Sequence, residues 1–195
     1  MTIEELDNRF DKIIEETNAL GTIMVQIASS ALTMVRDRVI ETGENAEGSK
    51  YDPYSTTPML ANCSSMNVAA CGTVAGSKEK RKDLKWVTIK RGGRNIKLFE
   101  IPGGYKQFRE LHGKQTGFVD FSFSGRMWAN IQIVSDNSEH NSGVARISAA
   151  SEENQKKLAG NTKKRGPILK LSQSEISTLG KDYNTHIMQI IEKYL

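Results

Sequence analysis

The sequence predicts an α+β fold: a mainly antiparallel sheet of hairpins, with a long N-terminal helix and a C-terminal helix packed on it. Two observations carry this prediction. Helical periodicity occupies both ends of the 195-residue chain, whereas strand-like alternation is confined to its middle. The strand-like segments also follow one another through short turns, which favours antiparallel pairing. We expect a single domain over residues 1–195, a length that supports one hydrophobic core.

A long helix is predicted over residues 2–42. Its apolar residues recur mostly three, four or seven positions apart, which is the spacing of one helical face. Thr2 and Glu5 fit a capping box, in which each side chain accepts a hydrogen bond from an amide of the first turn. Gly21 marks either a kink or a break into two helices. A small domain has too little core to cover such a helix, so its apolar face serves either the core or a partner.

Residues 43–85 are predicted to form a long extended loop or insertion. Gly43, Gly48, Pro53 and Pro58 interrupt any regular pattern. A connection of this length inside a compact domain is either functional or ordered by a neighbour. Its lysine-rich end, SKEKRKDLK, is either a solvated loop or a contact for phosphate or for an acidic protein surface.

A projecting β-hairpin is predicted over residues 86–101. Alternating apolar residues lead into and out of Gly92-Gly93, and a glycine pair supplies the positive φ angles that a tight hairpin requires. Basic residues, Arg91 and Arg94 among them, surround the tip. The glycine pair lacks the residue order of a phosphate-binding loop, so the hairpin is predicted as a structural or contact element.

Strands continue through the middle of the chain. A short helical or irregular stretch at 105–113 precedes a strand at 118–123. Strands at about 129–135 and 144–150 are joined by a polar turn and form a second hairpin.

Two helices are predicted at the C-terminal end. A short helix begins at Ser151 and ends at Gly160, and a basic loop follows it. Ser172 and Glu175 fit another capping box, which opens a last helix over residues 173–194. No internal repeat is recognised.

The residues show no catalytic arrangement, and we expect that the protein is not an enzyme. Ser124 does not fit the G-x-S-x-G pattern of a nucleophile elbow. His112 lies twelve residues away and by itself is a weak indication of a base. The pairs of adjacent glutamates lie on predicted helices, where charge is ordinary.

Neither a metal nor a cofactor is expected. Cys63 and Cys71 lie eight positions apart and the three histidines are scattered, whereas zinc sites use tighter, paired spacing. The two cysteines are expected to be small buried or free thiols. No apolar run reaches about 18 residues, so no transmembrane helix is predicted. The acidic N-terminus lacks the order of a signal peptide, and we expect a protein made and kept in a cytoplasm, or assembled from there.

The formal net charge of +4 and the pI near 9.0 permit binding to nucleic acid or to acidic partners. Basic residues gather in three stretches that a fold can bring to one face. The candidate DNA or partner contacts are Lys80, Arg81, Lys82, Arg91, Arg94, Lys163, Lys164 and Arg165. A cytoplasmic, sequence-independent nucleic-acid-binding protein is therefore the alternative function, although aromatic residues are not interleaved with these cations for base stacking.

The stretch GGYKQFRELHGKQTGFVDFSFSGRMWANI, residues 103–131, resembles the phage tail-completion and head–tail joining proteins of the virion-morphogenesis type. Members of that family often carry a small residue, glycine, an optional residue and then Leu or Met shortly after a strand, and an apolar strand follows. Ser124, Gly125, Arg126 and Met127 fit this pattern.

Other segments extend the resemblance along the chain. ASEENQKKLAGN resembles a short family helix that ends in glycine, and KRGPILKLSQSEI resembles the segment that opens the last helix. EGSKYDPYS corresponds to a Gly-x-aromatic-x-Pro-x-Ser segment after the first helix. The chain departs from the family where Gly166 separates Arg165 from Pro167, where Lys170 replaces a common glycine, and in the segments 59–84 and 86–101.

The resemblance implies a structural virion protein: a small α+β subunit of the neck that links the portal or its adaptor to the tail. Such subunits assemble into homo-oligomeric rings, often hexamers or dodecamers, around the DNA channel. Channel-facing basic residues would contact DNA phosphates without reading the sequence. Assembly would take place in the host cytoplasm, and the final location would be the neck or tail of the virion. A ring subunit needs two different contact surfaces, which fits the hydrophobic content of only 37% and the over-long first helix.

Residues 124–128 are interpreted as a structural joint between two strands. The Ser124 hydroxyl is expected to cap a helical turn, and Gly125 is expected to let the chain change direction. Met127 and Trp128 are expected in the core or in a subunit interface, and Arg126 at the surface beside a partner.

Overall fold

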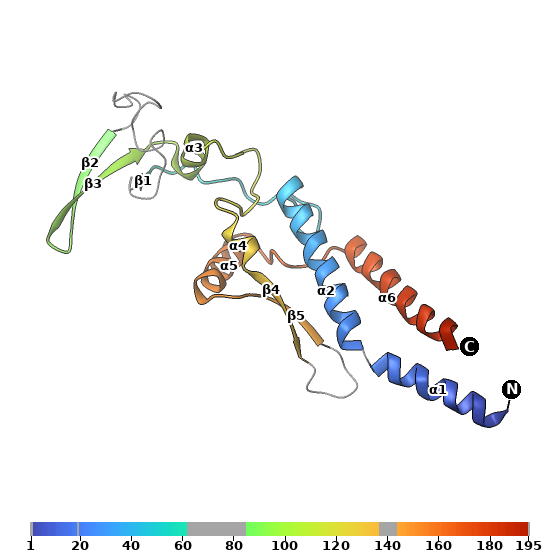
Figure 1. The fold of residues 1–195 in the computed structure, drawn as a ribbon. Coiled ribbons are helices and arrows are strands. Elements are labelled where there is room, and N and C mark those ends of the chain that lie inside the picture. Colours follow the sequence, from blue (N-terminus) through green and yellow to red (C-terminus); the bar gives the residue numbers. More distant parts are fainter. Residues whose placement is uncertain (1, 19, 62–84, 137–143, 195) are drawn as a thin grey trace. The chain divides into compact units, whose positions relative to one another are not determined.

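The computed structural model describes residues 2–18, 20–61, 85–136 and 144–194. Figure 1 shows the fold. Element η1 is a π-helical turn. The elements in chain order are α1 (Ile3–Asn18), α2 (Leu20–Asp37), η1 (Arg38–Thr42), β1 (Met59–Ala61), β2 (Lys85–Arg91), β3 (Arg94–Ile101), α3 (Gly104–Leu111), α4 (Arg126–Ala129), β4 (Ile131–Asp136), β5 (Val144–Ala149), α5 (Glu152–Arg165) and α6 (Gln173–Tyr194).

The predicted α+β class is confirmed, and every strand pair is antiparallel. The described strands form two sheets, with the orders β1-β3-β2 and β4-β5. The chain divides into two compact units. Unit 1 comprises Met1–Tyr51 and Asp120–Leu195, and unit 2 comprises Asp52–Val119. The expected single domain over residues 1–195 stays a prediction.

Helix α2 is the centre of unit 1. It contacts β4 and β5 on one side and α6 on the other (Figure 1). Its buried residues Ala28, Ala31 and Val35 recur at helical spacing. Ile131 and Ala149 are paired in the β4–β5 ladder and are both buried. Because side chains alternate along a strand, these two residues define the face of the hairpin that packs on the helix.

The predicted N-terminal helix is in fact two helices, α1 and α2, described on either side of residue 19. Gly21 lies in the first turn of α2, consistent with the alternative of a break. The capping box at the start of α1 is confirmed. The Thr2 amide donates to Glu5 Oε2 at 2.7 Å, and the Glu5 amide donates to Thr2 Oγ1 at 3.2 Å.

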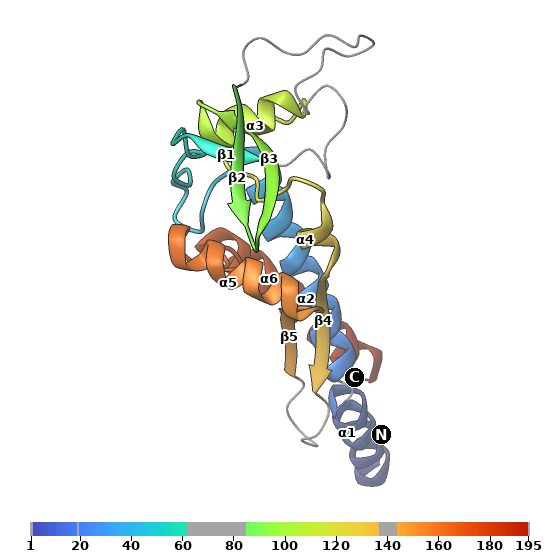
Figure 2. The same cartoon turned by 90° about the vertical axis from the view of Figure 1, so that its left-hand side faces the viewer.

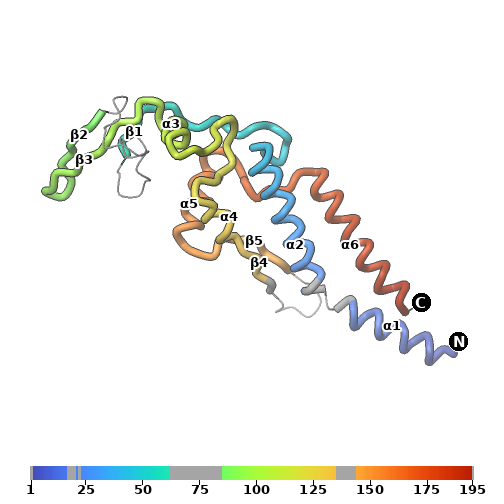
Figure 3. Tube along the Cα trace, turned by 45° about the horizontal axis from the view of Figure 1, so that its top comes forward, coloured from blue at the N-terminus to red at the C-terminus, as the bar shows by residue number. Residues whose placement is uncertain are grey.

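Helix α1 contacts the C-terminal end of α6 and continues past it, as Figure 3 shows. Leu6 and Ile13 are half-buried. At the far end of α6, Lys193 pairs with Glu16, and the Tyr194 hydroxyl donates to the same carboxylate at 2.5 Å. The hydrogen bonds from Lys193 and Tyr194 lower the pKa of Glu16 below its usual value.

A buried ion pair joins the end of α2 to the start of α6. Arg38 Nε donates to Glu175 Oε1 at 2.8 Å, and the two side chains are only 13% and 10% exposed. Arg38 also donates to the carbonyl oxygens of Glu44 at 2.7 Å and Lys170 at 2.8 Å. Burial raises the pKa of Glu175, but hydrogen bonds from Arg38 and from the Ser172 amide outweigh it and leave the pKa below its usual value.

Helix α6 begins and ends where the sequence predicts. Its capping box is confirmed, because the Ser172 amide donates to Glu175 Oε2 at 2.7 Å and the Glu175 amide donates to Ser172 Oγ at 3.2 Å. Glu175 therefore caps the helix and pairs with Arg38 at the same time.

Helix α5 is longer than predicted. Ser151 begins it as expected, and its hydroxyl accepts a hydrogen bond from the Asn154 amide at 3.4 Å. Gly160 does not end the helix, which continues to Arg165. The helix stops at Gly166, whose φ of +87° is readily reached only by glycine. The predicted basic loop is thus the last helical turn, where cations interact favourably with the helix dipole.

Unit 2 is built on the β2–β3 hairpin, which confirms the predicted hairpin. Gly92 and Gly93 form its turn with φ angles of +58° and +77°. The core of the unit lies at the other end of the sheet, where Phe99 and Ile101 pack with Phe108 of α3. Figures 1 and 2 show α3 at this end of the sheet, away from the tip.

The entry into α3 is tightly packed. A Cβ at Gly104, which has φ +63°, would lie 2.3 Å from the carbonyl oxygen of Thr57. The buried Arg109 donates from Nε to the Gln115 carbonyl at 3.0 Å and lies 4.3 Å above the centre of the Tyr54 ring. These contacts attach the segment before β1 and the loop after α3 to one helix.

Residues 118–123 form no strand, which corrects the predicted strand there. The Ser122 amide donates to Asp120 Oδ1 at 2.8 Å in a local turn. Phe121 has a φ of +51°, which lies outside the strand region. The apolar residues alternate as in a strand, but this segment forms a local turn and no hydrogen-bonded strand pair.

Within the predicted extended segment 43–85, the structure describes residues 43–61 and residue 85. Glu44 and Lys50 form an isolated antiparallel bridge, which closes a turn after η1. Met59–Ala61 form β1, which pairs with β3 and so is not a loop. The remaining residues 62–84, with Cys63 and Cys71, lie outside the described residues.

Candidate assembly surfaces

The joint at 124–128 is organised around a buried tryptophan. Met127 and Trp128 are 8% and 4% exposed, whereas Arg126 is exposed. The Trp128 indole donates from Nε1 to the Asp120 carbonyl at 3.1 Å and thereby ties α4 to the preceding turn. The Asn130 carbonyl accepts a hydrogen bond of 2.7 Å from the amide that follows β5. The joint therefore connects α4 with the start of β4 and the end of β5, at the open end of the hairpin.

Gly125 gives the joint its change of direction. It immediately precedes α4 with φ +75°, a left-handed conformation that side chains disfavour. Space around a Cβ here is open, so the restriction is one of backbone conformation. Ser124 does not cap α4, which corrects the expected role of its hydroxyl. The N-cap position is occupied by the left-handed glycine, and no side chain caps this short helix.

The predicted basic contacts fall in different parts of the chain. Lys80, Arg81 and Lys82 lie outside the described residues. Arg91 and Arg94 face each other across the hairpin tip of unit 2 and are exposed. The three cations of the C-terminal stretch lie in the last turn of α5 in unit 1: Lys163, Lys164 and Arg165. Each group is described within its own unit.

Helix α1 leaves an apolar stripe on the surface. Ile3, Phe10 and Ile14 are 89%, 48% and 55% exposed. At 3.6 residues per turn, the three side chains lie within about 40° of one another around the helix axis. The half-buried Leu6 and Ile13 lie next to this stripe around the helix axis. The apolar face of α1 is therefore half-buried along one line and exposed along the next.

An acidic row borders the exposed stripe. Glu4, Asp7, Asp11 and Glu15 recur three and four positions apart, so they line one edge of the helix. All four are exposed, and none of them pairs with a cation in the part of the chain that the structure describes. In total α1 carries six acidic and two basic residues. The stripe and the row together form a surface that is apolar along one line and negative along the next.

The β2–β3 hairpin has a matching surface of opposite charge. Val87 pairs with Leu98 and Ile89 with Ile96, so all four side chains share one face. Phe99, which packs against α3, lies on the other face. The side chains of this four-residue face are each half-buried. The two strands carry five basic residues and one acidic residue.

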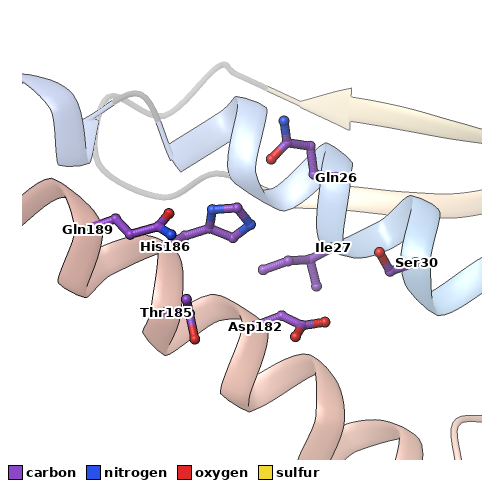
Figure 4. A pocket seen from close by; sticks show the side chains of 7 residues that line it. All are labelled: Gln26, Ile27, Ser30, Asp182, Thr185, His186 and Gln189. Atoms are coloured by element: carbon purple, nitrogen blue, oxygen red, sulfur yellow. The ribbon is translucent and has the colours of Figure 1, made fainter.

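A shallow polar groove lies between α2 and α6 (Figure 4). Its volume is about 170 Å³, and polar side chains dominate the lining. The lining residues are Gln26, Ile27, Ser30, Asp182, Thr185, His186 and Gln189.

Three residue types of a hydrolytic triad occur in this groove: Ser30, Asp182 and His186. Figure 4 shows the carboxylate, the imidazole and the hydroxyl apart from one another. No hydrogen bond joins any two of these three described side chains, whereas a nucleophile and its base must lie within hydrogen-bond reach. The arrangement is that of a polar helix–helix contact.

Ligand-binding groups of other kinds were sought over the described ranges. Within residues 2–18, 20–61, 85–136 and 144–194, no cluster of three or more His, Cys, Asp or Glu side chains is placed to hold a metal ion. Among the helices so described, none combines the length and the apolar character needed to cross a bilayer.

Sequence reasoning missed the acidic row on α1 and the apolar face of the hairpin. The acidic residues recur at helical spacing in the sequence, but such spacing does not distinguish a binding surface from the ordinary charge of a helix. The apolar alternation of the hairpin was visible too, but it does not reveal which face a helix covers. Comparison of the chain with protein-family models, with curated proteins and with solved structures finds no match.

Proposed function

We propose that this chain is a structural, non-catalytic subunit of a phage neck, a head–tail connector or tail-completion protein that assembles into a homo-oligomeric ring. The ring would link the portal or its adaptor to the tail and surround the DNA channel. The proposal combines the motif resemblance of residues 103–131 with surfaces that a monomer leaves unburied.

The observation that carries the proposal is the exposed stripe on α1. A stripe of Ile3, Phe10 and Ile14 in water gains nothing from hydrophobic burial, whereas contact with a partner removes that apolar area from water. The β2–β3 hairpin offers a second surface, whose apolar face is half-buried and bordered by cations. Two different surfaces are what a subunit in a closed ring requires, because each copy contacts its two neighbours differently.

Native mass measurement and negative-stain imaging test the proposal. The tagged chain is purified alone and after co-expression with the products of the genes that neighbour its own. We expect ring-shaped assemblies of the size of a hexamer or dodecamer, alone or on a portal or tail protein. A chain that stays monomeric with every such partner, and that is missing from the corresponding particles, would disprove the assignment.

A sequence-independent nucleic-acid-binding protein is the second candidate. The exposed cations of the β2–β3 hairpin favour it, since uncompensated positive charge attracts phosphates. The discriminating measurement is the affinity for duplex DNA as a function of salt. If this function holds, affinity falls steeply as salt rises, and replacing Lys80, Arg81 and Lys82 with Ala weakens it. Absence of measurable affinity near physiological salt excludes this candidate.

A further inference from the structure

Two surfaces of the chain complement each other in shape, length and charge. Helix α1 presents an apolar stripe beside an acidic row, and the β2–β3 hairpin presents an apolar face among cations. Sixteen helical residues at about 1.5 Å each span about 24 Å. The seven residues of β2 at about 3.3 Å each span about 23 Å.

We propose that α1 of one copy packs across the hairpin face of Val87, Ile89, Ile96 and Leu98 in the next copy, so that a head-to-tail contact builds the ring. This inference rests on the proposed self-assembly and names the interface that carries it.

In the single chain the stripe on α1 is exposed, and the four side chains of the hairpin face are half-buried, so both have apolar area left to bury. An amphipathic helix on the open face of a β-ribbon buries apolar side chains from both partners. Phe10 and Ile14 would contact the paired residues Ile89 and Ile96 at the middle of the hairpin. A two-stranded ribbon is marginal by itself, so a covering helix also stabilises the hairpin.

Charge sets the orientation of the contact and selects the partner. The acidic row Glu4, Asp7, Asp11 and Glu15 borders the stripe. On the hairpin, Arg91 and Arg94 share the apolar face, and further lysines line the other. Opposite charges along the rim of an interface increase the rate at which two copies associate. Like charges disfavour the pairing of two identical surfaces. The contact joins two different surfaces, so it closes into a ring or continues as a filament.

A reciprocal charge swap tests the interface in the full chain. The first variant, Arg91→Glu/Arg94→Glu, makes the hairpin tip acidic, and the second, Asp7→Lys/Asp11→Lys, makes the row basic. Each variant alone places like charges together, and we expect its self-association to weaken at least about tenfold in sedimentation velocity. An equimolar mixture of the two variants should regain assembly, because every contact in an alternating ring is then complementary.

Matched controls separate this contact from general charge effects. Lys156→Glu/Lys157→Glu and Glu152→Lys/Glu153→Lys change the same numbers of charges on α5 and should leave self-association unchanged. Circular dichroism establishes that each variant is folded, which is expected because all the substituted side chains are exposed. The uncharged variant Phe10→Ser should weaken assembly independently of salt.

Several outcomes overturn the interface. One is a wild-type chain that sediments as a monomer at every concentration. Another is a mixture that does not regain assembly, as expected if α1 covers the hairpin of its own chain or if residues 62–84 cover it. If particles still contain the chain while the mixture fails, the proposed function stands and this interface is wrong. If the mixture assembles but no particle contains the chain, the interface stands and the neck function is wrong.

Discussion

Replacing Glu175 with alanine should destabilise unit 1 strongly. The carboxylate accepts hydrogen bonds from Arg38 Nε at 2.8 Å, from Arg38 Nη2 at 3.3 Å and from the Ser172 amide at 2.7 Å. Its removal leaves a guanidinium that is 13% exposed without its counterion. It also removes half of the capping box of α6.

The expected loss of folding free energy depends on which hydrogen bonds Arg38 keeps in the variant. Removing one partner of a buried ion pair typically costs 3–5 kcal/mol, because the other charge stays buried. Arg38 keeps the carbonyl oxygens of Glu44 and Lys170 as acceptors, which favours the lower end of this range, about 3 kcal/mol. For a chain of this size, each kcal/mol lowers the Tm by roughly 2–4 °C, so we expect a loss of about 6–12 °C.

Thermal and urea unfolding, followed by circular dichroism, measure the change. The matched control is Glu47→Ala, which breaks an ion pair with Lys170 whose side chains are 56% and 54% exposed. This control should cost less than about 1 kcal/mol. A double-mutant cycle with Arg38→Met should give a coupling energy of about 1–3 kcal/mol. A loss for Glu175→Ala no larger than that of the control would refute the reasoning.

The same site predicts a pH dependence. The pKa of Glu175 is lower in the folded chain than in the unfolded chain, so its contribution is present at neutral pH. That contribution is lost as the pH falls below the ordinary carboxyl value of about 4.5 and through the lower folded pKa. The variant Glu175→Gln should therefore lose less stability than the wild type over this acidic range. Equal losses in the two proteins would argue against the ion pair.

Three further predictions concern other parts of the chain. Gly125→Val should reduce soluble yield and particle incorporation, because a β-branched residue disfavours a φ of +75°. Met127→Asp should have the same effect, because it buries a charge. Normal yield and normal incorporation of both variants would refute the interpretation of residues 124–128 as a structural joint. Gly104→Ala should unfold unit 2 in limited proteolysis, since its Cβ would meet a carbonyl oxygen at 2.3 Å; an unchanged digestion pattern would contradict this. Glu16→Gln should speed amide exchange in α1, because it weakens the contact with Lys193; unchanged exchange would show that packing alone holds α1 on α6.

Local signals in the sequence located several element ends correctly. Both capping boxes form as predicted, because each depends only on residues three positions apart. The glycine pair at 92–93 likewise specifies its hairpin turn, because the positive φ angles are a property of these two residues.

Other predictions failed where two local signals competed. Gly160 was a plausible helix stop, but Gly166 adopts the positive φ and ends α5 six residues later. The alternation at 118–123 fits a strand, but strand formation needs a pairing partner, and the hydrogen bond within the turn at Asp120 takes its place. A glycine or an alternating run of apolar residues shows which backbone conformations are allowed. The hydrogen bonds that neighbouring residues form determine which of these conformations is adopted.

The sequence by itself determined where helices begin, where the first hairpin turns and that the chain is α+β, because these depend on residues close together along the chain. Only the tertiary structure decided that Arg38 meets Glu175, 137 positions away, and that Ile3, Phe10 and Ile14 of α1 remain exposed. Periodicity shows that a helix has an apolar face, but burial depends on which other element lies there. This exposed stripe on α1, beside its acidic row, is the surface on which the proposed ring contact is based.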